Sequence, residues 1–192
     1  MNRQIRILSS NPEKIKEIRD ILNEFNIEVI PNKIKLEELQ TDDVIHLVKD
    51  KALKAYKKIG RPLIVEHTGL YIEKINGLPG GLTQIFWDTL QADKFAEIFG
   101  ASDNSSIAQA KTTVCYVDGK NFKIFEGKIN GYITNPPKGD RTFQWDCIFI
   151  PDGKNMTFAE MGTLEKNKIS MRKQEFVFRS VEQPKTIRNI QT

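Results

Sequence analysis

The chain has 192 residues, with 29 lysines and arginines against 25 aspartates and glutamates, and a formal net charge of +4 at pH 7. This length is typical of one compact domain, so we expect a single domain over residues 1–192. No apolar run approaches the ~20 residues that a membrane-spanning helix needs. The first residues carry no apolar signal core. The sequence therefore predicts a cytoplasmic protein with no membrane partner.

The rarer residue types exclude several kinds of site. Cys115 and Cys147 are the only two cysteines, too few for a disulfide framework and without the paired spacing of a metal site. Two histidines exclude a histidine-rich metal site. A weakly basic chain suits a nucleic-acid binder, a binder of phosphate ligands, or neither. Because no arginine-rich block or known binding motif is present, we expect no nucleic-acid partner.

The first elements along the chain are a strand, a turn and a helix. Residues 5–8 form an apolar run, and apolar residues recur at helical spacing between residues 15 and 22. Asn11 before Pro12 is typical of a helix N-cap with proline at the first helical position. The start of such a helix can seat a phosphate. The same opening is also the ordinary first βα unit of an α/β fold.

The rest of the chain predicts mixed elements. The patterns indicate strands at 27–30, 63–65, 110–117, 122–125, 127–133 and 143–150, a hairpin turn at 118–121, helices from residue 42 or 43 and over 84–99, and a helix from 169 to about 181. Helix–strand units followed by hairpins and a closing helix predict an α/β fold with a mixed, partly antiparallel sheet.

Seven short segments match one protein family in order and spacing. They are Ser9–Lys14, Leu36–Gln40, Val65–Leu70, Asn76–Gly80, Phe143–Gly153, Thr157–Met161 and Lys166–Arg172. Through these segments the chain resembles the inosine triphosphate pyrophosphatases, which hydrolyse ITP, dITP and XTP to the monophosphate and pyrophosphate. The resemblance implies an elongated mixed sheet with flanking helices, a cleft between two lobes, a homodimer, and Mg²⁺ delivered with the nucleotide.

The resemblance also implies roles for individual residues. The implied nucleotide-binding set is Ser9, Asn11, Lys14, Lys51, Thr68, Phe143, Trp145, Asp146, Lys166 and Arg172. Lysines and a helix start suit phosphate, and Glu38 suits Mg²⁺, which prefers carboxylate oxygen. The aromatic rings would stack on the base, Asp146 would accept hydrogen bonds from its N–H groups, and Arg172 would donate to its 6-oxo group.

The chain departs from this family at the catalytic centre. Where the family carries an acidic residue after Glu66, assigned to magnesium binding and water activation, this chain has His67. Imidazole offers nitrogen where magnesium prefers oxygen, so magnesium affinity should fall. Histidine can nevertheless serve as a general base near pH 7. Met171 stands where histidine is usual, Gly81-Leu82 where proline and an aromatic are usual, and Cys147 where proline is usual.

Two functions fit this pattern of retained binding residues and an altered hydrolytic centre. The first is a nucleotide sensor that binds dITP, ITP or XTP, hydrolyses it slowly or not at all, and acts through an effector protein partner. Stress or antiviral signalling is a setting for such a protein. The alternative is a working Mg²⁺-dependent pyrophosphatase in which His67, helped by Glu66, is the base. We favour the sensor.

Overall fold

The structure is a computed structural model that describes residues 3–173, and the chain divides into two compact units. Within the described residues, unit 1 comprises residues 3–67, 112–127 and 172–173, and unit 2 comprises Thr68–Lys111 and Lys128–Met171. The helix expected from residue 169 to about 181 lies for the most part outside the described residues.

The strands form a six-stranded sheet in the order β2-β1-β3-β4-β5-β6. Their bounds are β1 (Arg3–Leu8), β2 (Ile27–Asn32), β3 (Leu63–Ile72), β4 (Ile107–Val117), β5 (Phe122–Ile133) and β6 (Phe149–Pro151). Strands β2 and β3 pair with β1 in parallel, with Ile7 opposite Ile64, and β6 pairs with β5 antiparallel. The predicted mixed, partly antiparallel sheet is therefore confirmed.

Helix α1 (Pro12–Asn23) follows β1 in unit 1 and begins where the sequence predicts. The side-chain oxygen of Asn11 accepts hydrogen bonds from the backbone N–H groups of Glu13, at 2.9 Å, and Lys14, at 3.1 Å. The apolar stripe of α1 is buried against β1, β2, β3 and β4, where it forms the hydrophobic core of unit 1.

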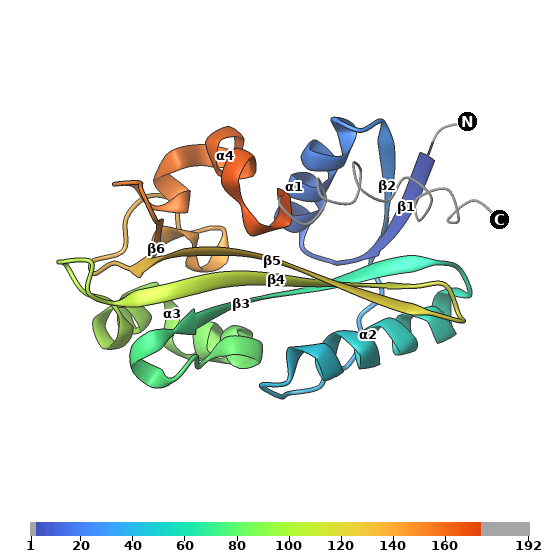
Figure 1. The fold of residues 1–192 in the computed structure, drawn as a ribbon, viewed down its shortest axis with the longest axis horizontal. Coiled ribbons are helices and arrows are strands. Elements are labelled where there is room, and N and C mark those ends of the chain that lie inside the picture. Colours follow the sequence, from blue (N-terminus) through green and yellow to red (C-terminus); the bar gives the residue numbers. More distant parts are fainter. Residues whose placement is uncertain (1–2, 174–192) are drawn as a thin grey trace. The chain divides into compact units, whose positions relative to one another are not determined.

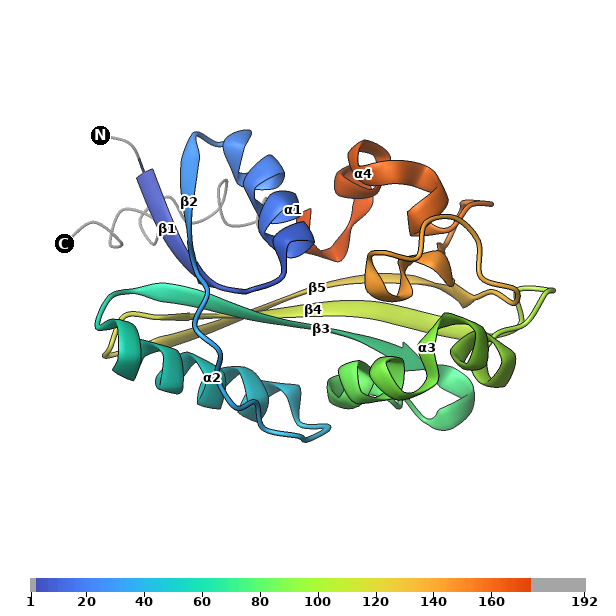
Figure 2. The same cartoon turned by 180° about the vertical axis from the view of Figure 1, so that it is seen from behind.

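Helix α2 (Val44–Ile59) is the second helix of unit 1. The Asp43 carboxylate accepts a hydrogen bond from the backbone N–H of His46 at 2.9 Å, and Gly60, at a φ of 65°, ends the helix in the left-handed conformation. Figures 1 and 2 show α1 and α2 on opposite sides of the strands in this unit. Side chains that alternate along β3 can therefore be buried on both faces.

Unit 2 holds the remaining helices. They are η1 (Glu73–Ile75), η2 (Gly80–Leu82), α3 (Thr83–Phe99), η3 (Gln144–Cys147) and α4 (Phe158–Ile169). In Figure 2, α3 lies below the strands of this unit and α4 lies above them. Gln91, at a φ of 55°, interrupts α3, and its side-chain amide donates hydrogen bonds to the carbonyls of Trp87 and Asp88.

The strand predicted for residues 143–150 is wrong. Only Phe149–Pro151 is strand, and Gln144–Cys147 is a 3₁₀ turn that begins with Gln144 at a φ of 45°. The alternation of apolar residues favoured a strand, but all residues from Trp145 to Ile150 are buried, so burial does not follow a period of two. The turn places Trp145 within the aromatic core of unit 2.

The hairpin predicted at residues 118–121 is confirmed. The Asp118 carboxylate accepts hydrogen bonds from the backbone N–H groups of Lys120, at 2.9 Å, and Asn121, at 2.8 Å, between the end of β4 and the start of β5. An Asx-type turn of this kind fixes the register of the two strands it joins.

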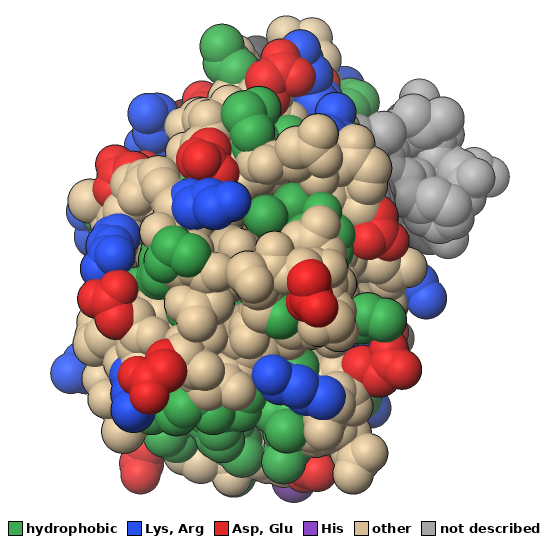
Figure 3. Space-filling model, turned by 90° about the vertical axis from the view of Figure 1, so that its left-hand side faces the viewer, with side chains coloured by type: hydrophobic (Ala, Val, Ile, Leu, Met, Phe, Trp, Pro, Cys, Tyr) green, Lys and Arg blue, Asp and Glu red, His purple; other side chains and the backbone are tan. Residues whose placement is uncertain are grey.

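The surface carries charges of both signs. Figure 3 shows one face, on which acidic and basic side chains are interspersed and hydrophobic side chains gather at the lower edge. This face has no continuous basic patch of the kind that binds nucleic acid. Within residues 3–173, none of the helices has the length and apolar character needed to cross a bilayer.

Candidate functional site

A buried charge cluster forms the centre of unit 1. The Glu66 carboxylate, on β3, accepts hydrogen bonds from Nε of Arg172 at 2.8 Å and from its Nη2 at 3.4 Å. The Lys14 ammonium, in the first turn of α1, lies 2.9 Å from the same carboxylate. Arg172 also donates from Nη1 to Glu17 at 2.8 Å. One arginine and one lysine thus share a carboxylate whose side chain is 6% exposed.

In this cluster Glu66 and its cationic partners stabilise one another's charged forms. Burial alone would raise the pKa of Glu66, but Arg172 and Lys14 hold it well below its ordinary value. Burial lowers the pKa of Lys14, and the Glu66 carboxylate opposes that shift. Glu66 is therefore an anion whose oxygens are already occupied by the protein's own cations.

His67 follows Glu66 in β3 and is 9% exposed. Burial, and after it the ammonium groups of Lys14 and Lys51, lower the pKa of His67 to about 4. The imidazole is thus neutral at pH 7. Within the part of the chain that the structure describes, its buried Nε2 atom has no hydrogen-bond partner. A neutral imidazole carries one donor and one acceptor nitrogen, so this atom can exchange a hydrogen bond with a ligand.

Lys51, on helix α2, is the second lysine near His67. Its ammonium is 2.8 Å from the Glu38 carboxylate and donates a hydrogen bond to the backbone carbonyl of Glu66 at 3.3 Å. The Glu38 side chain is 40% exposed, so it can turn toward a cation without leaving a buried charge behind. Among the predicted residues of unit 1, the structure thus brings Lys14, Lys51 and Glu38 to the vicinity of His67.

These residues fit a bound Mg²⁺ poorly. Glu66 is occupied by Arg172 and Lys14, and the position after it offers an imidazole nitrogen rather than oxygen. Glu38 is the remaining carboxylate, and it is paired with Lys51. Within the described residues, no three histidine, cysteine, aspartate or glutamate side chains gather in a way that could hold a metal ion.

The start of α1 is less open to an anion than the sequence suggested. The Asn11 side-chain oxygen is used by the backbone N–H groups of Glu13 and Lys14, and the Ser9 hydroxyl accepts a hydrogen bond from the backbone N–H of Asn11 at 3.2 Å. The helix dipole and the Lys14 ammonium remain as attractions for a phosphate. Ser9 and Asn11 therefore shape the helix start in this structure, and their contact with a nucleotide stays a prediction.

Residues 68–70, which follow His67 in the sequence, pack against the glycine-rich turn at residues 77–81 in unit 2. A Cβ at Gly69 would collide with the carbonyl oxygen of Gly80, so glycine is required for this close approach. The Thr83 hydroxyl donates to that carbonyl at 2.7 Å and accepts from the backbone N–H of Leu70 at 2.9 Å. These contacts fix the backbone next to Thr68, one of the predicted nucleotide-binding residues.

A second ion pair is buried in unit 2. The Lys166 ammonium lies 2.6 Å from the Asp146 carboxylate, and both side chains are 7% exposed. The same ammonium lies 3.8 Å from the centre of the Phe143 ring and 5.6 Å from that of Phe158. Phe143 and Asp146, predicted for the base, therefore meet Lys166, predicted for the base or the phosphates, and together they offer an aromatic ring, an acceptor and a donor.

Trp145 is part of the core of unit 2. It is 4% exposed and packs edge-on against Phe149, with ring centroids 5.9 Å apart. Its indole Nε1 is buried and has no hydrogen-bond partner in residues 3–173. The ring thus supports the Phe143–Cys147 segment, and its predicted stacking on a base stays a prediction.

Arg172 makes its contacts inside unit 1, and its predicted contact with the base stays a prediction. The residue is 1% exposed, and its guanidinium donates hydrogen bonds to Glu66 and Glu17. Glu17, which is 3% exposed, was not among the predicted site residues. A signal existed, since Glu17 stands three residues after Lys14 and four before Ile21, within the stripe that α1 buries.

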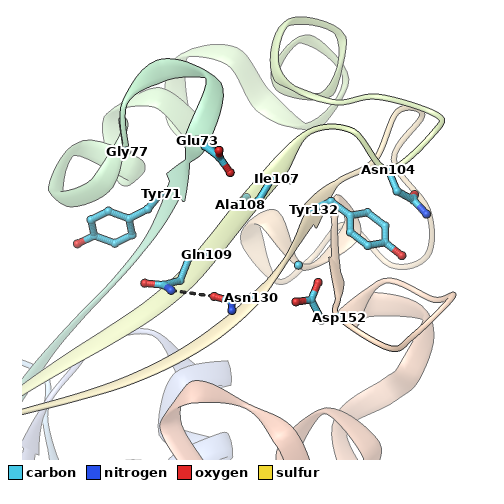
Figure 4. Close-up of a pocket in the computed structure, with 11 residues that line it drawn as sticks. Tyr71, Glu73, Gly77, Asn104, Ile107, Ala108, Gln109, Asn130, Tyr132 and Asp152 are labelled. Atoms are coloured by element: carbon cyan, nitrogen blue, oxygen red, sulfur yellow. Dashed lines mark hydrogen bonds between the residues drawn. The ribbon is translucent and has the colours of Figure 1, made fainter.

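An open pocket of about 510 Å³ lies elsewhere in unit 2, over β3, β4 and β5 (Figure 4). Figure 4 shows Tyr132 and Asp152 on one side of it and Glu73 on another, with Gln109 and Asn130 joined by a hydrogen bond of 2.8 Å. None of the predicted nucleotide-binding residues lines this pocket.

The whole chain is similar to curated nucleotide pyrophosphatases. It is 34% identical over 174 residues to a dITP/XTP pyrophosphatase of Pyrobaculum aerophilum, covering 90% of this chain and 92% of that protein. It is 36% identical over 185 residues to the inosine triphosphate pyrophosphatase of Saccharomyces cerevisiae, covering 91% of this chain and 93% of that one.

The fold is similar to that of solved Ham1 proteins. The HAM1 protein of Coxiella burnetii superposes with a TM-score of 0.74 at 25% identity, covering 97% of this chain and 98% of that one. The Ham1 protein of Staphylococcus aureus gives a TM-score of 0.69 at 21% identity, covering 92% and 96%.

The sequence profile of the Ham1 family matches residues 5–177. The chain therefore belongs to the Ham1 family, to which inosine triphosphate pyrophosphatases belong, and the predicted family is confirmed. Its mixed α/β fold, with a six-stranded sheet and flanking helices, is the fold of that family.

Proposed function

We propose that this chain binds 6-oxopurine nucleoside triphosphates (dITP, ITP or XTP) and hydrolyses them slowly or not at all. The observation that carries the proposal is the buried, neutral imidazole of His67 next to the lysines of unit 1. A neutral imidazole cannot supply the negative charge that holds a metal beside the attacking water. The lysines that attract phosphate remain in place.

The buried pair of unit 2 supports a purine ligand. Asp146 provides an acceptor and Lys166 a donor, and Phe143 provides a ring face beside them. A 6-oxopurine carries an N–H next to its oxo group, whereas adenine presents an unprotonated nitrogen and an amino group at these positions. A site that pairs the first pattern leaves buried polar groups unsatisfied with the second.

The proposal extends to how the protein acts. A protein that binds a nucleotide without turning it over needs an effector protein partner to produce a response, so we propose a sensor subunit in the cytoplasm. Detection of abnormal nucleotides during stress or viral infection is the proposed setting. We further propose that residues 1–192 act as one domain and assemble as a homodimer, as the family resemblance implies.

A working pyrophosphatase is the second candidate. The names of the relatives, dITP/XTP pyrophosphatase and inosine triphosphate pyrophosphatase, favour it. The Nε2 atom of His67, unpartnered in the described part of the chain, could take a proton from water, but a pKa of about 4 makes this imidazole a weaker base than an ordinary histidine. In this case Glu66 would orient the reacting groups, and Mg²⁺ delivered with the nucleotide would bind at Glu38.

Two measurements on one preparation separate the candidates. Calorimetric titration measures the binding of dITP, and a pyrophosphate-release assay with Mg²⁺ measures its hydrolysis. We expect tight binding and intact dITP after long incubation. Rapid release of pyrophosphate would identify the pyrophosphatase, and failure to bind dITP would contradict both candidates.

A further inference from the structure

We propose that His67 is a phosphate-binding residue and that it adapts the charge cluster of unit 1 to hold a triphosphate without a divalent cation. This inference rests on the proposed binding of nucleoside triphosphates. It concerns how the ligand is held, and it differs from the magnesium requirement that the family resemblance implies.

The charges around His67 are balanced. The cations Lys14, Lys51 and Arg172 face the carboxylates Glu66, Glu38 and Glu17, so this group of described residues has no net charge. An acidic residue at position 67 would add one negative charge and favour a metal ion. A neutral imidazole leaves the group balanced, so an arriving triphosphate meets no uncompensated negative charge.

The carboxylates that remain are committed to the protein's own cations. Two hydrogen bonds from Arg172 and one ion pair with Lys14 occupy the oxygens of Glu66. To bind a metal, Glu66 would have to give up these contacts inside a buried site, which is costly for a charged group. Of the three described carboxylates in this group, Glu38 is the most exposed, and Mg²⁺ would meet it beside the Lys51 ammonium.

Lys14 and Lys51 can each exchange a carboxylate partner for a phosphate oxygen. The side chain of Lys14 is 18% exposed and that of Lys51 is 13% exposed, so both retain access to solvent while paired. A phosphate oxygen can take the place of either carboxylate oxygen, because it accepts the same kind of charge-assisted hydrogen bond from an ammonium group. Glu66 keeps its bonds to Arg172 when Lys14 turns to a ligand, so no buried carboxylate is left unpaired.

The Nε2 atom of His67 completes this set. It is buried and lacks a hydrogen-bond partner within residues 3–173. Buried polar atoms without a partner are rare in native proteins and call for an explanation. As the tautomer with hydrogen on Nε2, the imidazole can donate a hydrogen bond to a phosphate oxygen. An ionised carboxylate at the same position has no hydrogen to donate and would need a bridging cation to contact the phosphate.

The test is calorimetric titration of the purified chain with dITP, in buffer with excess Mg²⁺ and in buffer with EDTA. We expect similar Kd values in the two buffers. In the His67→Asp variant we expect EDTA to weaken binding by about tenfold or more, the effect of one lost charge-assisted contact. His46→Asp, at the other and exposed histidine on α2, is the matched control and should behave like the parent.

A second probe is inorganic tripolyphosphate, which has no base. We expect it to compete with dITP in EDTA, and His67→Asn to weaken its binding in both buffers. The His67→Asn variant keeps a neutral, buried side chain, so it also guards against a folding defect in His67→Asp. Thermal unfolding followed by circular dichroism verifies the fold of each variant.

The outcomes separate this inference from the proposed function. Loss of dITP binding by the parent in EDTA overturns metal-independent binding but leaves nucleotide binding intact. Unchanged tripolyphosphate affinity in folded His67→Asn overturns the phosphate contact of His67. Failure of the parent to bind dITP in either buffer contradicts the proposed function itself, and the inference falls with it.

Discussion

Arg172 and Glu66 are 106 residues apart in the sequence and are joined by two hydrogen bonds, of 2.8 and 3.4 Å, in the buried part of unit 1. The pair links the end of the described chain to β3. Because Arg172 also binds Glu17 on α1, one guanidinium connects a strand and a helix. A bidentate arginine–carboxylate contact has a fixed geometry, so it positions Glu66 as well as neutralising it.

Replacing Arg172 should therefore destabilise the protein strongly. Arg172→Ala leaves the carboxylates of Glu66 and Glu17 buried, and breaking a buried pair in this way costs about 3–5 kcal/mol. Urea unfolding followed by fluorescence measures the change. Arg141→Ala is the matched control, because Arg141 makes an ion pair of the same length, 2.8 Å, to Asp93 with side chains 53% and 75% exposed. The control should unfold like the parent.

A different outcome would support the predicted contact of Arg172 with the base. If Arg172→Ala is as stable as the parent but binds dITP and dATP equally, the guanidinium reads the base rather than supporting Glu66. Arg172→Lys sharpens the distinction, because a lysine keeps the charge but loses the bidentate geometry.

Lys14→Ala should weaken the binding of triphosphates far more than that of monophosphates. The reason is that the Lys14 ammonium is proposed to contact phosphate, and a charge-assisted hydrogen bond contributes about 1.5–3 kcal/mol, or roughly ten- to a hundredfold in Kd. Calorimetric titrations with dITP and with dIMP measure the Kd of each ligand. Lys16→Ala, at an exposed position on the same helix, is the control. An equal loss for both ligands would argue against a phosphate contact.

Selectivity for the base should depend on the buried pair of unit 2. We expect the parent to bind dITP at least about tenfold more tightly than dATP, because a mismatched buried polar group costs roughly 1–3 kcal/mol. In the Asp146→Asn variant the difference in affinity between dITP and dATP should become smaller. An amide of the same shape replaces the carboxylate that accepts hydrogen bonds. Equal affinities of the parent for dITP and dATP would contradict this assignment of Asp146 and Lys166.

The stability of the chain should rise with pH between about 4.5 and 6.5. His67 has its pKa lowered from the ordinary 6.5 to about 4, so the unfolded chain binds a proton in this range that the folded chain does not. The neutral-His67 contribution, of order 3 kcal/mol, is complete above pH 6.5 and is lost as the pH falls toward 4. Glu66, whose pKa is also lowered, acts in the same direction but below 4.5.

Urea unfolding at a series of pH values measures this slope. His67→Asn removes the titrating group and should flatten the slope between pH 4.5 and 6.5. His46→Asn, at an exposed position, should retain the slope of the parent. A parent whose stability is constant across the range would contradict the lowered pKa of His67.

Local signals in the sequence predicted local structure well. The Asn11-Pro12 pair predicted the start of α1, and the Asp118–Asn121 turn predicted the hairpin, because in each case a side chain bonds to backbone groups a few residues away.

Helix α4 was not predicted, although Thr157 and Glu160 form a capping box at its start. Gly162 interrupts the helix and Leu164 is 80% exposed, so its apolar periodicity is faint.

Long-range contacts could not be derived from the sequence in the same way. The family resemblance singled out Lys14, Glu66 and Arg172, but nothing in their spacing shows that they meet in one buried cluster. The sequence also does not show that the side-chain oxygen of Asn11 caps its own helix rather than contacting a ligand. The same residue type serves in both roles. Residue types thus suggest a chemistry for the site, and the fold decides which partners each group has.

His67→Asp should raise the release of pyrophosphate from dITP in the presence of Mg²⁺. The new carboxylate would stand beside Glu38, and two oxygen ligands with the substrate phosphates suit Mg²⁺ better than one. A metal held there can lower the pKa of a bound water and supply the nucleophile. The lysines near position 67 would compensate the added charge, so the variant should fold.

The gain should be partial, because Met171, at a position where the family resemblance implies a histidine, is buried in the core of unit 2 and supplies no polar group. Steady-state assays of the parent, His67→Asp and His46→Asp with dITP and Mg²⁺ measure the effect. Since the removal of one member of a catalytic unit costs orders of magnitude in rate, its return should raise kcat by about tenfold or more. A parent that already turns over dITP quickly, and a His67→Asp variant that is slower, would instead identify His67 as a working base. Background rates in all three proteins would contradict the view that the missing carboxylate alone prevents hydrolysis.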